Sequence, residues 1–209
     1  GIKPLYYHWD NREFIFGSEL KSIKASGIQL KINKQIIPLF LHLGYIPQNH
    51  TIYQNTFKLP AGSYGIIKNK EFNVHSFWSP ENCIEKEPIA NYQAAKKKLN
   101  NELKLAVEKR LISDVPLGTF LSGGIDSSLV SAIASKQSNT KLNTFSIGFK
   151  DAQHNESKYA TRVAKHLNTN HHEFILTQND ALDQLEQIMD NFDQPFADSS
   201  ALPTYLVSK

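Results

Sequence analysis

Cysteine is almost absent from this sequence, since Cys83 is the only one among 209 residues. A single thiol excludes an internal disulfide framework and a zinc site built from several cysteines, and it is typical of a reducing compartment. Long apolar runs are also lacking. The longest, at residues 36–41, contains Pro38 and is far too short to span a bilayer. We therefore expect a cytoplasmic protein with no membrane partner.

A strong excess of one charge is missing as well. The 23 Lys and Arg residues against 20 Asp and Glu give a net charge of +3, and no part of the chain forms a basic domain. This balance predicts no nucleic-acid partner. Residues 1–7 contain no Met and no leader-like segment, and residues 207–209 end within a helical pattern. We therefore expect an internal piece of a longer protein.

Residues 1–85 predict short strands separated by turns. Aromatic-rich runs at 5–9 and 13–16 flank a polar turn, which is typical of a hairpin. A short helix is expected at 18–24, and a second one, capped by Asn33, stops at Gly44. Two further strands, at 63–67 and 72–78, are separated by Asn69 and Lys70. This part of the chain is therefore expected to be mixed and mostly β.

Residues 86–209 predict a regular alternation of strands and helices. A connector at 79–88 precedes a helix at 91–111 that carries Leu99, Leu103 and Val107 on one face. Strands are expected at 116–121, 142–149 and 171–176, and helices at 129–135, 158–167 and 181–192. Such alternation predicts a parallel sheet with right-handed crossovers.

The most informative segment joins the first of these strands to its helix and reads Ser122-Gly123-Gly124-Ile125-Asp126-Ser127-Ser128. Two glycines permit a tight turn with outward backbone N–H groups, and the helix that begins near Ser127 adds the positive end of its dipole. This arrangement binds anions such as phosphate, and the three serines add hydroxyl donors. A carboxylate such as Asp126 beside an anion site indicates a cation, for which Mg²⁺ is suited.

Three other loop motifs do not fit this segment. A Walker loop requires a lysine, which is absent here. A dinucleotide-binding fingerprint requires Gly-x-Gly-x-x-Gly, which Gly123 and Gly124 do not supply. A nucleophile elbow requires glycine two residues before the serine, where Phe120 precedes Ser122.

Two neighbouring histidines, His171 and His172, invite interpretation as metal ligands. Successive side chains of a strand point to opposite faces, so the two rings make a poor ligand pair. We therefore expect structural roles for both.

The segment 122–128 resembles the pyrophosphate loop (PP-loop), Ser-Gly-Gly-x-Asp-Ser-Ser, of the N-type ATP pyrophosphatases. Segments 113–118, 144–149 and 193–200 resemble glutamine-hydrolysing asparagine synthetases of the class B type. Segments 1–7, 17–21 and 44–47 are similar to the later part of the glutaminase domain of that family. The resemblance thus covers nearly the whole chain.

This resemblance implies two incomplete domains. Residues 1–85 would be the C-terminal part of a glutamine amidotransferase type 2 domain, an α+β segment of the N-terminal-nucleophile (Ntn) type. Residues 86–209 would be the N-terminal part of an α/β, Rossmann-like ATP pyrophosphatase domain that is incomplete at its C-terminus. The implied enzyme is a ligase of asparagine biosynthesis, with glutamine, aspartate and ATP as partners, and a homodimer is compatible with it.

The implied reaction has two steps. ATP adenylates the side-chain carboxylate of aspartate with release of pyrophosphate, and ammonia from glutamine then displaces AMP. In this family the matching residues would divide as follows: Leu121 and Ile147 line the adenine and ribose pocket, Ser122, Gly123, Gly124, Ser127 and Ser128 hold the phosphates, and Asp126 binds Mg²⁺.

Other parts of the family's machinery are not found. The glutaminase nucleophile of the family is an N-terminal cysteine, expected before Gly1, so no catalytic residue is assigned within the chain. We expect the chain alone neither to hydrolyse glutamine nor to make asparagine. Residues 197–200, Ala-Asp-Ser-Ser, also depart from the Thr-Thr-x-Arg element of some asparagine synthetases. The alternatives are an amidotransferase or β-lactam synthetase-like enzyme acting on another carboxylate, and a non-catalytic ATP-binding fragment.

Overall fold

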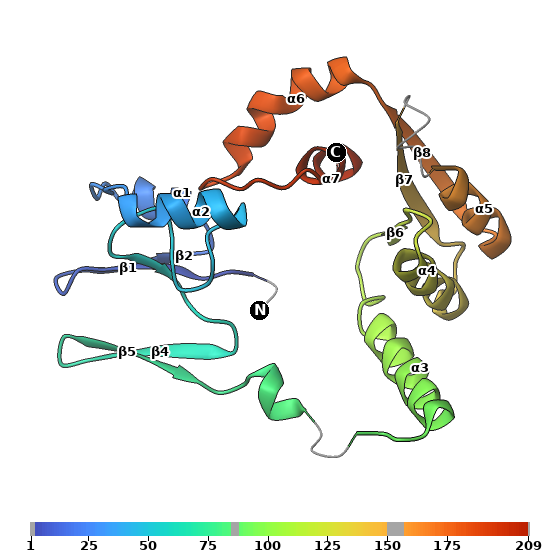
Figure 1. Ribbon diagram of the computed structural model, residues 1–209, viewed down its shortest axis with the longest axis horizontal. Coiled ribbons are helices and arrows are strands. Elements are labelled where there is room, and N and C mark those ends of the chain that lie inside the picture. The colour runs from blue at the N-terminus through green and yellow to red at the C-terminus, as the bar shows by residue number, and fades with distance from the viewer. Residues whose placement is uncertain (1–2, 85–87, 150–156, 209) are drawn as a thin grey trace. The chain divides into compact units, whose positions relative to one another are not determined.

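The computed structural model describes residues 3–84, 88–149 and 157–208 (Figure 1). Contacts between residues divide the chain into two compact units. Unit 1 comprises residues 1–86 and 187–199, and unit 2 comprises residues 87–186 and 200–209. A short segment close to the C-terminus therefore belongs with the N-terminal part of the chain.

Unit 1 contains a three-stranded antiparallel sheet in the order β2-β1-β3. Strands β1 (Tyr6–Trp9) and β2 (Phe14–Gly17) form the predicted hairpin, in which Tyr6 pairs with Gly17 and Trp9 with Phe14. Strand β3 (Thr56–Lys58) pairs with the other edge of β1. It was not predicted from the sequence, because three residues are too few to show an alternating pattern.

The helices of unit 1 lie where the sequence predicts them, except that the second helix begins later than expected. Helix α1 spans Leu20–Ala25, and α2 (Ile37–Leu43) ends at Gly44, whose φ of 76° permits a left-handed cap. Asn33 caps a separate 3-10 helix, η1 (Lys34–Ile36), by accepting a hydrogen bond from the backbone N–H of Gln35 at 3.2 Å. Asn33 is thus a cap as expected, but it caps the 3-10 turn that precedes α2 and not α2 itself.

A second hairpin of unit 1 consists of β4 (Ser63–Lys68) and β5 (Glu71–Ser76). The turn residues Asn69 and Lys70 both have positive φ, as a type I′ hairpin turn requires. The ring of Phe72 on β5 lies 4.7 Å from that of Tyr7 and 5.0 Å from that of Phe14, so aromatic packing links the two sheets. The 3-10 helix η2 (Pro80–Cys83) follows, and Cys83 is exposed.

Unit 2 contains the predicted parallel sheet, in the order β6-β7-β8. In chain order its elements are α3 (Tyr92–Glu108), β6 (Gly118–Phe120), α4 (Ile125–Gln137), β7 (Asn143–Phe149), α5 (Ser157–Leu167), β8 (Asn170–Leu176), α6 (Gln178–Asn191) and α7 (Ala201–Ser208). The last turn of α6 belongs to unit 1. Helix α4 begins at Ile125 with Gly124 as its N-cap, which is earlier than the start near Ser127 and the range 129–135 expected from the sequence.

The predicted apolar faces of the helices are only partly buried. On α3, Val107 joins a core cluster with Ile133, Ala134 and Leu142, whereas Leu99 is 60% exposed. An apolar stripe shows which face a helix can bury, but not how far along its length a neighbour covers it. Within the described residues, no helix is long and apolar enough to cross a membrane.

Candidate functional site

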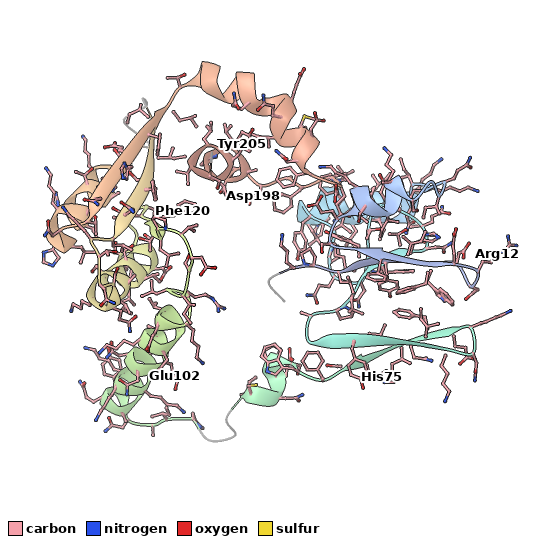
Figure 2. The ribbon with its side chains drawn as sticks, turned by 180° about the vertical axis from the view of Figure 1, so that it is seen from behind. Arg12, His75, Glu102, Phe120, Asp198 and Tyr205 are labelled. Atoms are coloured by element: carbon pink, nitrogen blue, oxygen red, sulfur yellow. The ribbon has the colours of Figure 1, made fainter. Side chains whose placement is uncertain are left out.

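The candidate site lies where β6 ends and α4 begins. Phe120 is the last residue of β6 (Figure 2), and the N–H of Leu121 donates to the carbonyl of Phe145 on β7 at 2.7 Å. Leu121 is 1% exposed and packs against Ala160 and Ala164 of α5. The loop therefore leaves a fixed point at the carboxyl end of a parallel strand, where open α/β sheets bind their ligands.

Gly123 determines the shape of the loop. Its φ is +85°, and a Cβ atom at this position would lie 2.5 Å from the backbone N of Ala160 and 2.6 Å from the Cβ of Tyr159. Only glycine combines this backbone conformation with so close an approach to α5. Gly124, with φ of −70°, is the N-cap of α4.

Two serine hydroxyls close the loop on itself. The Oγ atoms of Ser122 and Ser127 lie 2.9 Å apart, and Ser122 Oγ also accepts from the N–H of Gly124 at 3.3 Å. Ser127 Oγ accepts from the N–H of Ser122 and lies in donating distance of the carbonyl of Gly124, both at 3.3 Å. These contacts hold the strand end and the first turn of α4 in one arrangement.

The Ser128 hydroxyl differs from these two. Its Oγ is buried and has no hydrogen-bond partner among the described residues. Burying a hydroxyl without a partner costs about 1–3 kcal/mol, and such groups in native structures call for an explanation such as a bound molecule. Ser128 is thus able to donate to an anion held by the loop.

The first turn of α4 supplies both signs of charge. Its leading N–H groups have no acceptor within the helix, and the helix dipole places partial positive charge there. Asp126, in the same turn, is exposed. The donors suit phosphate oxygens, and the carboxylate suits a hard cation that accompanies them.

The predicted site residues are not all equally accessible. Residues 121–124 form the turn after β6, and residues 125–128 form the first turn of α4. Ile147 lies on the adjacent strand β7, two residues beyond the position paired with Phe120. Ile147 is half-buried and pairs in register with Phe174. The side chain of Leu121 is buried against α5 and is therefore not accessible at the surface of the loop.

The histidines of β8 have separate partners, as expected from strand alternation. Nδ1 of His171 lies 2.9 Å from Thr144 Oγ1, and its Nε2 lies 3.2 Å from Ser146 Oγ. Burial lowers the pKa of His171. His172 instead stacks on Phe145 at 5.1 Å between ring centres. The two rings therefore do not form a metal site, and His171 bridges two hydroxyls within the sheet.

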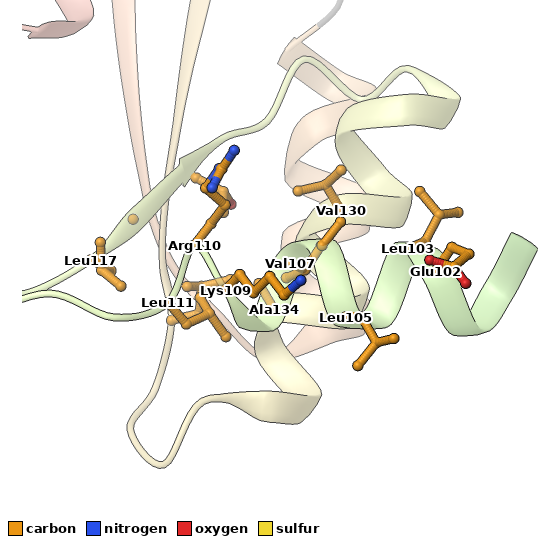
Figure 3. A pocket seen from close by; sticks show the side chains of 14 residues that line it. Glu102, Leu103, Leu105, Val107, Lys109, Arg110, Leu111, Leu117, Val130 and Ala134 are labelled. Carbon is orange, nitrogen blue, oxygen red and sulfur yellow. The ribbon is translucent and has the colours of Figure 1, made fainter. Parts of the chain in front are cut away.

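A separate cleft of about 550 Å³ in unit 2 lies between α3, α4 and β6 (Figure 3). Its walls are mostly apolar and include Leu103, Val107, Val130 and Ala134, with charged side chains such as Arg110 at its border. None of the residues 121–128 lines it. We therefore do not include this cleft in the candidate phosphate site.

Unit 1 has a cleft of about 390 Å³ that sequence reasoning missed, with Tyr6, Glu19, Lys58 and Asp193 among its lining residues. Lys58 Nζ donates to the carbonyl of Ile46 at 2.7 Å, and burial lowers the pKa of Lys58. Burial, followed by the charge of Asp193, raises the pKa of Tyr6. No sequence pattern indicates that residues so far apart along the chain meet.

Comparison with known proteins gives two family matches. The family model described as asparagine synthase matches residues 98–209, and the one described as glutamine amidotransferase domain matches residues 1–78. A candidate asparagine synthetase [glutamine-hydrolyzing] 2 of Methanocaldococcus jannaschii is 39% identical over all of this chain and 41% of its own length. Asparagine synthetase [glutamine-hydrolyzing] 1 of Bacillus subtilis is 32% identical over all of this chain and 33% of its own. Asparagine synthetase [glutamine-hydrolyzing] 2 of Arabidopsis thaliana is 33% identical over 90% of this chain and 29% of its own length. The chain thus spans less than half the length of these curated relatives.

Proposed function

The chain belongs to the asparagine synthase family, and from this premise we propose that it forms part of a glutamine-hydrolysing asparagine synthetase. The observation that carries the proposal is the segment 121–128 at the carboxyl end of β6, which combines the turn at Gly123, the N-terminus of α4 and the buried Ser128 hydroxyl that has no partner among the described residues. The relatives named above are asparagine synthetases, which favours aspartate over other acceptor carboxylates. No comparison favours a β-lactam synthetase-like enzyme or a non-catalytic module.

We assign the two domains as the sequence predicts. Residues 1–85 form the C-terminal part of an amidotransferase domain of the Ntn type, which the antiparallel sheet of unit 1 supports. Residues 86–209 form the N-terminal part of a Rossmann-like ATP pyrophosphatase domain, which the parallel sheet of unit 2 supports. A cytoplasmic location and a homodimer remain predictions.

The loop holds the phosphates of ATP. Gly123 and Gly124 bring the backbone close to the phosphate oxygens, while Ser122 and Ser127 keep the turn closed. The buried hydroxyl of Ser128 gains in the bound nucleotide the acceptor that it lacks within the described residues. Ile147 and the backbone of Leu121 border the adenine and ribose.

Asp126 fits the Mg²⁺ that accompanies ATP, because it is an exposed carboxylate in the turn that binds the phosphates. When bound, the metal ion neutralises charge on the phosphate oxygens. Asp126 also offsets, through its own negative charge, the repulsion between the metal ion and the positive end of α4.

The chemistry has two balanced steps. A carboxylate oxygen of aspartate bonds to the α-phosphorus of ATP while the bond to pyrophosphate breaks. The nitrogen of ammonia then bonds to the acyl carbon, AMP leaves with the bridging oxygen, and the nitrogen loses a proton. Residues 122–128 stabilise the charge on the departing pyrophosphate, because their donors are already oriented before the bond breaks.

The proposal is tested by measuring pyrophosphate release by the intact enzyme that contains this chain. With ATP, Mg²⁺ and ammonia present, we expect release when aspartate is added. We expect little release when aspartate is replaced by glutamate or by alanine, which has no side-chain carboxylate. Release that depends equally on any carboxylate would contradict the assignment of aspartate, and ATP binding without release under all conditions would contradict the enzyme.

A further inference from the structure

Residues 187–199 connect the two family matches in an unexpected way. They lie inside the range 98–209 that matches the asparagine synthase model. By their contacts, however, they belong to unit 1, whose residues 1–78 match the amidotransferase model. We refer to residues 190–197, which make the contacts described next, as the strap.

Asp193 contacts the start of α1 through both of its carboxylate oxygens. Its Oδ2 accepts from the backbone N–H of Leu20 at 2.6 Å. Leu20 is the first residue of α1, and the N-cap residue Glu19 offers this helix no side-chain cap. The other oxygen, Oδ1, lies 3.6 Å from Nζ of Lys21. With its side chain only 11% exposed, Asp193 makes these contacts largely shielded from water, which strengthens them.

Other contacts hold the strap on both sides of Asp193. Nζ of Lys21 donates to the carbonyl of Asp190 at 2.5 Å. Gln194 Oε1 accepts from the N–H of Ile52 at 3.3 Å, and the N–H of Ala197 donates to the carbonyl of Gly44 at 2.8 Å.

These contacts fix the position of the strap on unit 1. The groups of Leu20, Ile52 and Gly44 that contact it are backbone groups, which cannot rotate away as side chains can. Leu20 is 1% exposed, and Ile52 belongs to the core cluster of Ile36 and Ile46. The strap is therefore bound to backbone groups of unit 1, two of which belong to buried residues.

The strap is also tied covalently to the nucleotide-binding sheet. After Ala197 the chain passes through residues 198–200 and enters α7, which packs against β7. Strand β7 carries Ile147 of the candidate nucleotide site. The position of the strap thus restricts where residues 198–200 lie.

We propose that Asp193 is a positioning residue that couples glutamine hydrolysis to amide formation, an inference that rests on the proposed function. With the strap seated, the segment 198–200 is held in one place, and ammonia from glutamine is used for synthesis. With the strap released, the hydrogen bond of Ala197 to Gly44 no longer fixes the start of this segment, and glutamine is hydrolysed without product.

The test uses the intact enzyme that contains this chain and measures glutamine hydrolysed per asparagine formed. A hydrogen bond to a charged group is strong enough to shift an equilibrium about tenfold. For Asp193→Ala we therefore expect this ratio to rise about two- to tenfold. With free ammonia at saturation in place of glutamine, we expect the rate of asparagine formation to stay near that of the wild type.

Asp190→Asn is the matched control, because Asp190 is exposed and serves Lys21 through its backbone carbonyl. We expect its ratio to equal that of the wild type. Gln194→Met, which removes the acceptor for Ile52 while keeping the side-chain length, should raise the ratio in the same direction. It provides the test if Asp193→Ala does not fold.

Two results would overturn the inference. One is an unchanged ratio in folded Asp193→Ala or Gln194→Met enzyme. The other is an equal fall of both rates together with a lower melting temperature, since a purely structural role reduces the amount of active enzyme without changing the ratio. A wild-type enzyme that makes no asparagine from either nitrogen source would instead refute the proposed function, and this inference with it.

Discussion

Gly123→Ala is the substitution for which the structure predicts the largest effect on the loop. The new Cβ would lie 2.5 Å from the backbone N of Ala160, 2.6 Å from the Cβ of Tyr159 and 2.8 Å from its carbonyl carbon. These atoms belong to the first turns of α5 and cannot move without shifting the helix. The neighbours must therefore give way as a unit, and the loop must open.

The expected cost combines two effects. Placing a side chain at a φ of +85° costs about 1–2 kcal/mol. Overpacking against a fixed neighbour adds roughly 1–3 kcal/mol. We therefore expect a loss of about 2–5 kcal/mol in the free energy of unfolding of unit 2.

Native-state hydrogen exchange of the α5 amides measures this loss within unit 2. Tryptophan fluorescence would not do so, because Trp9 and Trp78 both belong to unit 1. The protection of α5 should fall by the equivalent of the expected free energy, and ATP binding should fall with it.

Substitutions at two other glycines separate the conformational cost from the packing cost. Gly27 lies in unit 1 and has a φ of +91° with no atom within 4 Å of its Cβ position. Hydrogen exchange of the α1 amides in Gly27→Ala should therefore show the conformational cost alone. Gly124 has a φ of −70° and only Ser122 Oγ near its Cβ position, at 3.3 Å, so Gly124→Ala should cost only the roughly 0.5–1 kcal/mol of a poorer N-cap. Equal losses for Gly123→Ala and Gly27→Ala would refute the packing argument.

Three further predictions concern the loop and the sheet. Asp126→Asn should raise the Mg²⁺ concentration needed for pyrophosphate release by about tenfold or more without changing the melting temperature, since Asp126 is exposed; an unchanged Mg²⁺ dependence would show that it holds no metal. Ser128→Ala should raise the free energy of unfolding by about 1 kcal/mol and weaken ATP binding about tenfold, because its Oγ is buried without a partner among the described residues. Ser135→Ala, whose Oγ donates to the Ala132 carbonyl in the same helix, should leave ATP binding unchanged, and equal effects of both substitutions would contradict the assignment. The lowered pKa of His171 means that the unfolded chain binds a proton more readily, so stability should rise with pH up to about the ordinary value of 6.5 and then level off. The slope of the free energy of unfolding against pH should be smaller in His171→Gln when unfolding is measured across that pH range. An unchanged slope would assign the effect to another group.

Much of the local structure could be predicted because it depends on neighbouring residues. The hairpin turn at Asn69 and Lys70 has the positive φ values that such a turn needs, and the left-handed cap at Gly44 ends α2. The parallel sheet followed from strands that alternate with helices. In each case the chemistry that decides the structure lies within a few residues of the same segment.

The candidate loop could be located from its sequence, but not all of its properties could. Two glycines between a strand and a helix predicted an anion-binding turn. That Gly123 is packed against α5, and that Leu121 is buried beneath the same helix, required the positions of Tyr159, Ala160 and Ala164. Burial depends on what lies above a side chain, and this is set by distant parts of the chain.

The sequence by itself determined the order of elements, the hairpins, the parallel alternation and the phosphate-type loop, because each depends on short-range backbone preferences and periodic burial. Only the tertiary structure decided that Asp193 meets the N–H of Leu20, 173 residues away. It also decided that Leu99 stays exposed on a helix whose pattern predicted burial. The physical reason is the same for both. A carboxylate can accept from a distant backbone N–H, and an apolar face can be buried, only where the folded chain places the partner group beside it.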